Sequence, residues 1–314
     1  MSARQRRPVP VATTTVDTET PATTNKRTLH FFHQLEPWQQ DNHYIKSGYV
    51  PSTNSYWGCA KSLLYIHNET GNIYSHLIPG STAFLAVCAY LKWGLPRYPT
   101  YSGWWEEATF LMFGAACWGC LFMSSTFHCL KAHSHKVSKF GNQLDYFGIV
   151  ILITCSLISI MNFSYRPEPT VRNGFNFVFL VFGSICTYLT LHPEFSTPKY
   201  RPFRSFMFII FGLSGVLPIL CGIYWYGGSV AWERAQIKWL LLEGAFYIAG
   251  ALLYAGRIPE RFTHTDDPHV KGKFDIWGHS HQIFHVMVVI AAWCHWKALV
   301  GCYNYMHQVL LASP

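Results

Sequence analysis

The sequence predicts an all-α membrane protein, a bundle of seven transmembrane helices with a cytoplasmic N-terminus and the C-terminus outside. Half of the 314 residues are hydrophobic and only 13% are charged, whereas soluble domains contain about a quarter charged residues. Seven apolar stretches have the length of a spanning helix. Basic residues are also distributed unevenly between alternate loops, as expected for a multi-pass integral membrane protein.

The seven apolar stretches follow a polar N-terminal region. Their lengths match the roughly 17–25 residues of a membrane-spanning helix. They cover approximately residues 76–92, 107–127, 143–163, 174–192, 203–226, 236–256 and 279–301. We therefore expect a transmembrane domain over residues 76–303 and a short outside tail at 304–314.

The region before the first stretch divides into two parts. Residues 1–28 are polar, Thr-rich and without periodicity, so we predict a disordered cytoplasmic tail. Residues 29–75 place aromatic side chains among polar ones, and we expect an amphipathic, partly helical segment against the membrane face. Since no cleavable signal peptide is visible, the first apolar stretch would act as the targeting signal.

Basic residues predict the orientation, because cytoplasmic loops carry an excess of Lys and Arg. The larger group lies on the N-terminal side: Arg4, Arg6, Arg7, Lys26, Arg27, Lys46, Lys61, Lys131, Lys136, Lys139, Lys199, Arg201, Arg204, Arg257, Arg261, Lys271 and Lys273. The smaller group lies on the other side: Lys92, Arg97, Arg166, Arg172, Arg234, Lys238 and Lys297. This orientation is opposite to that of a G-protein-coupled receptor. The net charge of +8 suits anionic lipid headgroups rather than nucleic acid.

Three histidines lie at the ends of two apolar stretches. His281 and His285 are four residues apart and share a helix face, and His128 closes the second stretch. With the predicted topology, all three reach the cytoplasmic side at similar depth. Two imidazoles at i, i+4 with a third from another helix form a familiar zinc arrangement, which leaves one tetrahedral position open for water. We therefore predict a Zn²⁺ site at the membrane edge.

Two further polar residues are predicted to join this site. Asp145 opens the third stretch and could accept a hydrogen bond from zinc-bound water or orient a histidine. Ser124 lies one turn before His128 on the same face, where its hydroxyl could contact the water or a polarised carbonyl. Taken singly, Asp145 could be a helix cap and Ser124 a helix-packing residue. Because Asp145, Ser124 and the three histidines are all predicted to lie at a similar depth in the membrane, we favour one joint site.

Other candidate groups are weaker. Cys129 adjoins His128 but points about 100° away on a helix, so we expect it to pack as a small hydrophobe. Glu243 lies within the sixth stretch, either as a functional or as a paired intramembrane carboxylate. The segment THTDDPHV contains His264 and His269, which could bind a divalent ion weakly, although a hydrophilic loop is the simpler interpretation.

Five motifs in order carry a family resemblance. They are ETGNIYSHL at 69–77, SSTFHC at 124–129, LDYFGI at 144–149, GRIPER at 256–261 and FDIWGHSHQIFHV at 274–286. With them, the sequence resembles the adiponectin- and progestin-receptor family, related to the hemolysin III group, and especially its fungal members.

The resemblance implies a zinc ion held by His128, His281 and His285, with Asp145 contacting the zinc-bound water and Ser124 as the serine of its motif. It also implies hydrolysis of ceramide-type lipids, receptor function, and a link to zinc and sterol homeostasis. The extra THTDDPHV and the loop KAHSHKVS depart from the family pattern. They leave the ligands intact but alter the cytoplasmic entrance.

We therefore expect a zinc-containing, receptor-like lipid amide hydrolase in the plasma membrane or endoplasmic reticulum. Its partners would be membrane lipids such as ceramide, a sphingolipid or a sterol-like molecule, with an extracellular protein or lipid as a further ligand. The alternatives are a signalling receptor with a structural zinc site and a zinc sensor or transporter. A retinal-binding rhodopsin is disfavoured because the seventh stretch has no mid-membrane lysine.

Overall fold

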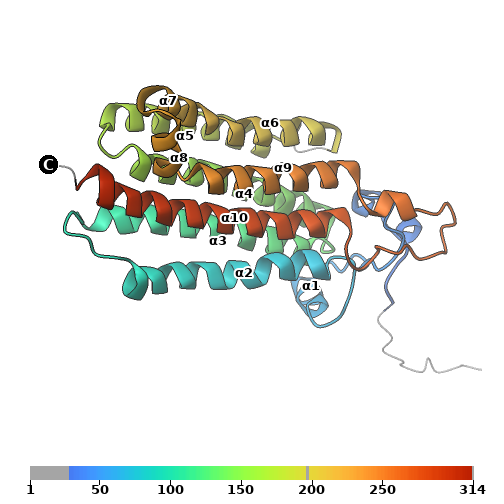
Figure 1. Ribbon diagram of the computed structural model, residues 1–314. Coiled ribbons are helices and arrows are strands. Elements are labelled where there is room, and N and C mark those ends of the chain that lie inside the picture. Colours follow the sequence, from blue (N-terminus) through green and yellow to red (C-terminus); the bar gives the residue numbers. More distant parts are fainter. Residues whose placement is uncertain (1–27, 196–197, 313–314) are drawn as a thin grey trace, which may run out of the picture.

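Long helices dominate the computed structural model, which describes residues 28–195 and 198–312. The predicted disordered tail lies outside these residues, except for its last residue. Within the described part, the only β-structure is an isolated bridge between His30 and Tyr49. Figure 1 shows the helices running side by side along one axis. The all-α fold class is therefore confirmed.

Six helical segments of the described chain are long and apolar enough to cross a membrane, with α6 and α7 counted as one. This confirms a multi-pass integral membrane protein. The bundle consists of α2 (Thr70–Ala89), α3 (Trp104–Leu130), α4 (His135–Ser164), α5 (Pro169–Leu191), α6 (Arg201–Leu213), α7 (Val216–Tyr226), α9 (Ile237–Gly256) and α10 (Ser280–Tyr305). Two short helices, α1 (Tyr56–Ser62) and α8 (Gly228–Arg234), lie outside these segments.

The first predicted span corresponds to α2, which is not among the six segments that are long and apolar enough to cross a membrane. It begins at Thr70 rather than residue 76, so its first two turns add Asn72 and Ser75. It packs against α3 and α10 and completes the seven-helix bundle. Polar side chains of its N-terminal half, such as Asn72 and His76, are buried inside the bundle. Because it contains these polar residues, α2 lacks the apolar composition of the other spans.

The fifth predicted span is divided into two helices at Ser214 and Gly215. Pro218 explains the division, because proline has no N–H to donate to the carbonyl four residues earlier. Instead, the Leu217 N–H donates to the Ser214 carbonyl at 3.1 Å. A tighter turn thus replaces the regular helical bond at this point.

The last long helix, α10, lies near the centre of the bundle, since it packs against α2, α4 and α9. Near its C-terminal end, Tyr303 packs with Phe110 of α3 and Phe163 of α4, with ring centroids 5.2 to 5.5 Å apart. All three aromatic residues are fully buried. Aromatic packing thus holds this end of the bundle, together with the fully buried pair of Glu106 and His307 at 3.0 Å.

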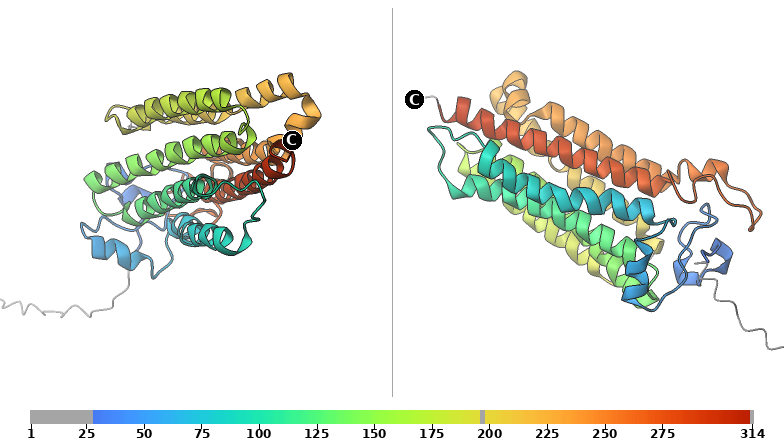
Figure 2. Two further views of the ribbon diagram at one scale, coloured as in Figure 1. Left: turned by 90° about the vertical axis from the view of Figure 1, so that its left-hand side faces the viewer. Right: turned by 90° about the horizontal axis from the view of Figure 1, so that it is seen from below.

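The segment before α2 covers the end of the bundle at which α10 begins (Figure 2). Asp275, just before α10, accepts hydrogen bonds from the Lys46 N–H at 2.7 Å and the Ser47 hydroxyl at 2.6 Å. Glu260 similarly accepts from the Asn42 amide at 3.1 Å. At the opposite end, residues 306–310 form a helical turn after α10. Residues 28–69 and the end of α10 therefore lie at opposite ends of the bundle.

Glycine allows close contact between α3 and α4. A Cβ on Gly148 would lie only 2.9 Å from the backbone Cα of Cys120. We expect Gly148→Ala to destabilise the protein by about 1–3 kcal/mol, the usual cost of overpacking, and to lower the midpoint of thermal unfolding in detergent. Gly119→Ala is the control, because the added Cβ would meet only the end of Met123 at 3.8 Å. Equal midpoints for the two variants would contradict this contact.

Candidate metal centre

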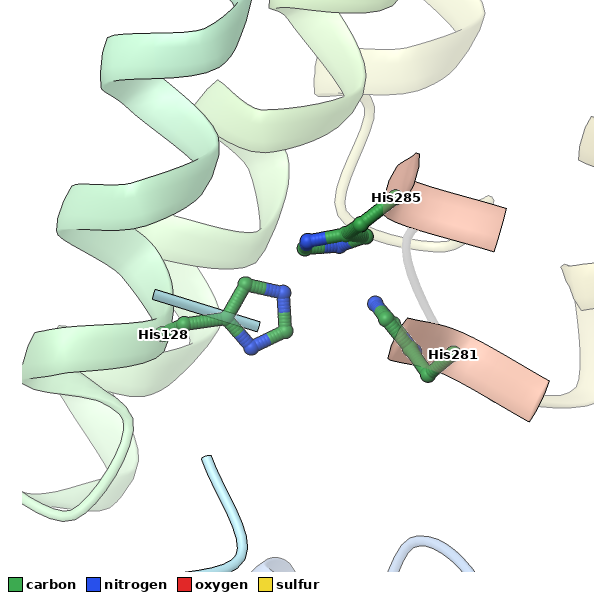
Figure 3. Close-up of side chains that lie close together, drawn as sticks. All are labelled: His128, His281 and His285. Atoms are coloured by element: carbon green, nitrogen blue, oxygen red, sulfur yellow. The ribbon is translucent and has the colours of Figure 1, made fainter. Parts of the chain in front are cut away.

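Three imidazoles converge between α3 and α10 (Figure 3). His128 lies near the end of α3, and His281 and His285 occupy the first two turns of α10. Their ring centroids are 4.7 to 4.9 Å apart, and one ligand atom from each lies within 4.8 Å of the others. Within residues 28–195 and 198–312, this is the one group of three or more such side chains that could hold a metal ion.

His128 is oriented by a carboxylate. Its Nδ1 lies 2.8 Å from Glu69 Oε2, and the other oxygen of Glu69 accepts from Lys131 Nζ at 2.8 Å. Burial raises the pKa of Glu69, but Lys131 and the hydrogen bond from His128 more than offset this and hold that pKa well below its ordinary value. Since the ionised carboxylate can only accept, Nδ1 of His128 is the donor. Its Nε2 is buried and has no hydrogen-bond partner among the described residues.

A backbone carbonyl group holds His285 in the same tautomer as His128. Its Nδ1 lies 3.0 Å from the carbonyl oxygen of Asn72, which can only accept, so Nδ1 carries the proton. Ser75 lies 3.3 Å from the same nitrogen. The ring of His76 stacks on the ring of His285, with ring centroids 3.7 Å apart. In both histidines the outer nitrogen is thus occupied and Nε2 retains its lone pair, which is the arrangement that metal-ligating histidines show. The triad therefore fits a metal ion.

Both predicted catalytic residues lie beside the triad. Ser124 is one turn before His128 on α3 and is buried, and Asp145 lies on the facing side of α4. The Ser124 hydroxyl is within hydrogen-bonding reach of the Asp145 carboxylate, which also interacts electrostatically with His128. These two side chains thus come from two helices that are in direct contact, and the catalytic roles expected of them stay predictions.

A small polar void reaches the triad from the covered end. Its volume is about 20 Å³, and its lining includes His281, Glu69, Lys131 and Arg257. This exceeds the roughly 10–15 Å³ that one water molecule needs. The void beside His281 therefore has room for one water molecule.

Other candidate ligands lie apart from the triad. Nε2 of His279 is 3.3 Å from the Asn68 carbonyl, and the Cys129 thiol is 3.8 Å from the Cys59 carbonyl. Glu243 pairs with His295 at 2.9 Å, and the other nitrogen of His295 lies 3.1 Å from Ser159. Of the two interpretations given for Glu243, a functional or a paired intramembrane carboxylate, its contact with His295 supports the paired one.

Sequence reasoning missed the residues that orient the histidines. Glu69, Asn72 and Ser75 all come from the segment ETGNIYS, which was recognised as a motif but given no role. The available signal in the sequence was Glu69, a charged residue that directly precedes the polar first turns of α2. Their partners could not be predicted because they lie on α3 and α10, far away in the sequence.

Comparisons with known proteins agree with this architecture. The model of the family described as Haemolysin-III related matches residues 64–296. The ADIPOR-like receptor IZH2 of Saccharomyces cerevisiae is 41% identical over 90% of this chain and 86% of its own length. The ADIPOR-like receptor IZH1 of Eremothecium gossypii is 43% identical over 89% of this chain and 86% of its own. The adiponectin receptor protein of Drosophila melanogaster is 36% identical over 88% of this chain and 60% of its own. Seven packed helices, the matched region and these relatives together show that the chain belongs to the Haemolysin-III related family of adiponectin- and progestin-receptor-like membrane proteins.

Proposed function

We propose that this protein is a zinc-containing, receptor-like membrane protein that hydrolyses the amide bond of ceramide-type lipids. The observation that supports it most is the buried triad of His128, His281 and His285 beside the Asp145 carboxylate. Three neutral imidazoles are a usual donor set for a catalytic zinc site. The buried Nε2 of His128, without a hydrogen-bond partner in the described chain, supports a metal at this position.

Zinc, when bound by these three histidines, would supply Lewis-acid polarisation of a carbonyl group and would make water more acidic. The chain itself would prepare the ligands. Glu69 keeps the proton of His128 on Nδ1, and the Asn72 carbonyl does the same for His285. The protein thus fixes the tautomers before any ion binds.

Asp145 is the general base and acid in this proposal. Its carboxylate takes a proton from a water molecule whose oxygen bonds to the amide carbon. As the C–N bond breaks, Asp145 returns that proton to the departing nitrogen, so that a fatty acid and an amine are released. Ser124, within hydrogen-bonding reach of Asp145, orients the carboxylate during both transfers.

The two reactants would reach the site by different routes. Water would enter through the void beside His281, under the segment that precedes α2. A ceramide is confined to the bilayer by its two chains, so it would enter between the membrane-spanning helices. The position of the triad at the ends of α3 and α10 suits an amide bond near the membrane edge.

The proposal is tested with purified protein in lipid nanodiscs. Metal analysis should find about one zinc ion per chain, and ceramides of several acyl lengths should be hydrolysed to equal amounts of fatty acid and amine. A protein that contains zinc but hydrolyses none of these ceramides would exclude the hydrolase. A protein without zinc would exclude the proposed cofactor.

A signalling receptor with a structural metal is the second candidate, because the relatives IZH2 and IZH1 are described as receptors. The contacts of Glu69 and Asn72 with the triad histidines support it, since they join α2, α3 and α10 at one point. In this case metal removal would change stability and signalling without any hydrolysis. Transport is less supported, because Glu243 is engaged by His295.

Glu69→Gln tests the orientation of the ligands. The amide keeps the shape of Glu69 but loses its charge, so the proton on Nδ1 of His128 is no longer fixed. We expect zinc affinity to fall about 10- to 100-fold, the usual effect of removing such a partner, as measured by competition with a chelating dye. Glu233→Gln, at an exposed position on α8, is the matched control. Unchanged affinity in Glu69→Gln would refute this role.

A further inference from the structure

An open cleft lies at the end of the bundle opposite the histidine triad. It has a volume of about 350 Å³ and is formed where α3 begins, α4 ends and α5 begins. Along α3, its first residue Trp104 and His128 are 24 residues apart, or roughly 36 Å at about 1.5 Å per residue. The cleft and the triad are therefore separated by about the thickness of a membrane.

Two arginines line this cleft, and neither has a carboxylate partner among the described residues. The guanidinium of Arg166 lies over the ring of Trp105, 4.2 Å from its centroid. Nε of Arg172 donates to Asn173 Oδ1 at 3.2 Å. Both side chains are thus positioned by neutral groups, and their two charges are close enough to repel each other.

The nearby acidic residues are engaged elsewhere. Glu168 pairs with Arg234, and Glu107 pairs with Arg97 at 2.9 Å. No acidic residue lines the cleft itself. Two guanidinium groups that line one cleft without a carboxylate partner favour an anion, and phosphate in particular, because its oxygens match their paired N–H donors.

The rest of the lining indicates that this anion belongs to a lipid. Ala108 and Met112 continue the cleft along α3 toward the middle of the helix, where a hydrocarbon chain would lie. Thr109 and Asn162 line the same part of the cleft, but the Asn162 amide donates to the Thr109 hydroxyl at 3.2 Å. Trp104 is 80% exposed at the rim, and tryptophan is enriched at the level of lipid headgroups. A soluble phosphate would use the arginines but not the surface of Ala108 and Met112.

We propose that the cleft binds the headgroup of an anionic phospholipid. The phosphate lies between Arg166 and Arg172, and an acyl chain follows Ala108 and Met112. This lipid would occupy the leaflet opposite the triad, so the site is separate from the proposed hydrolase and does not depend on it.

The test uses the full chain in phosphatidylcholine nanodiscs that contain increasing phosphatidic acid, with native mass spectrometry counting bound lipid and thermal unfolding reporting stabilisation. Each basic residue near an anionic lipid contributes about fivefold in affinity. We therefore expect the double variant Arg166→Gln/Arg172→Gln to bind phosphatidic acid roughly 25-fold more weakly. Arg166→Lys/Arg172→Lys, which keeps the charge without the paired donors, should be intermediate.

The control removes the same charge from the same end of the bundle. Lys238→Gln/Lys297→Gln changes two exposed lysines outside the cleft and should leave tight binding unchanged. Equal weakening in the control and the arginine variant would overturn the site. In a second arm, inorganic phosphate at constant ionic strength should not stabilise the protein. Stabilisation by phosphate with none by phosphatidic acid would overturn the assignment to a lipid.

Discussion

Replacing His281 with alanine should remove the metal from the purified protein and lower its thermal stability. His281 is one of only three ligands in the proposed site, and the two that remain would hold zinc weakly. An ion present at about 100-fold above its dissociation constant stabilises the folded state by about 2.7 kcal/mol, and this stabilisation would be lost. Metal analysis and thermal unfolding of the same samples would measure both effects.

The matched control is His279→Ala, two residues earlier, which is buried but bonded to the Asn68 carbonyl instead of the triad. It should keep its metal even if it loses some stability. A chelator should lower the unfolding midpoint of the wild type and of His279→Ala but leave His281→Ala unchanged. Full metal content in His281→Ala would contradict the assignment of this ligand.

Asp145→Asn should abolish ceramide hydrolysis and leave the metal bound. The amide occupies the same space but cannot accept a proton from water, and general-base catalysis contributes about 10²–10⁴-fold to a rate. Ser124→Ala should cause a smaller loss, because Ser124 only orients Asp145 in this proposal. Single-turnover hydrolysis, with zinc content measured in parallel, would separate the two effects.

Asp267→Asn provides the control, because it makes the same chemical change in an exposed loop. It should hydrolyse ceramide at the wild-type rate. If the wild type is active and Asp145→Asn is equally active, Asp145 is not the proton acceptor. If the wild type is inactive while Asp145→Asn alters signalling with metal and folding intact, the residue serves the receptor instead.

The sequence was sufficient to predict the fold class and the convergence of the histidines. Both depended on features that are local along the chain: stretches of apolar residues, the four-residue spacing of His281 and His285, and the position of His128 at the end of a stretch. A helix converts such spacing directly into direction, because each residue turns by about 100°. For this reason Ser124 also lies where its spacing from His128 placed it.

Features that depend on packing between helices could not be predicted in this way. Pro79 lies inside the continuous helix α2, whereas the helix divides just before Pro218. The same residue type thus has two outcomes. Glu69 likewise shows its role only once α2 lies beside the end of α3.

The polar half of α2 also has a consequence for the assembly of the protein. Ser75 of α2 lies 3.3 Å from His285, which is 210 residues later in the chain. Ribosomes add about 5–20 residues per second, so roughly 10–40 s separate the synthesis of these two partners. During that interval Ser75 and His76 of α2 lack their contacts with His285. We therefore expect α2 to be the first helix of the bundle made but among the last to reach its final position, when α10 closes the bundle.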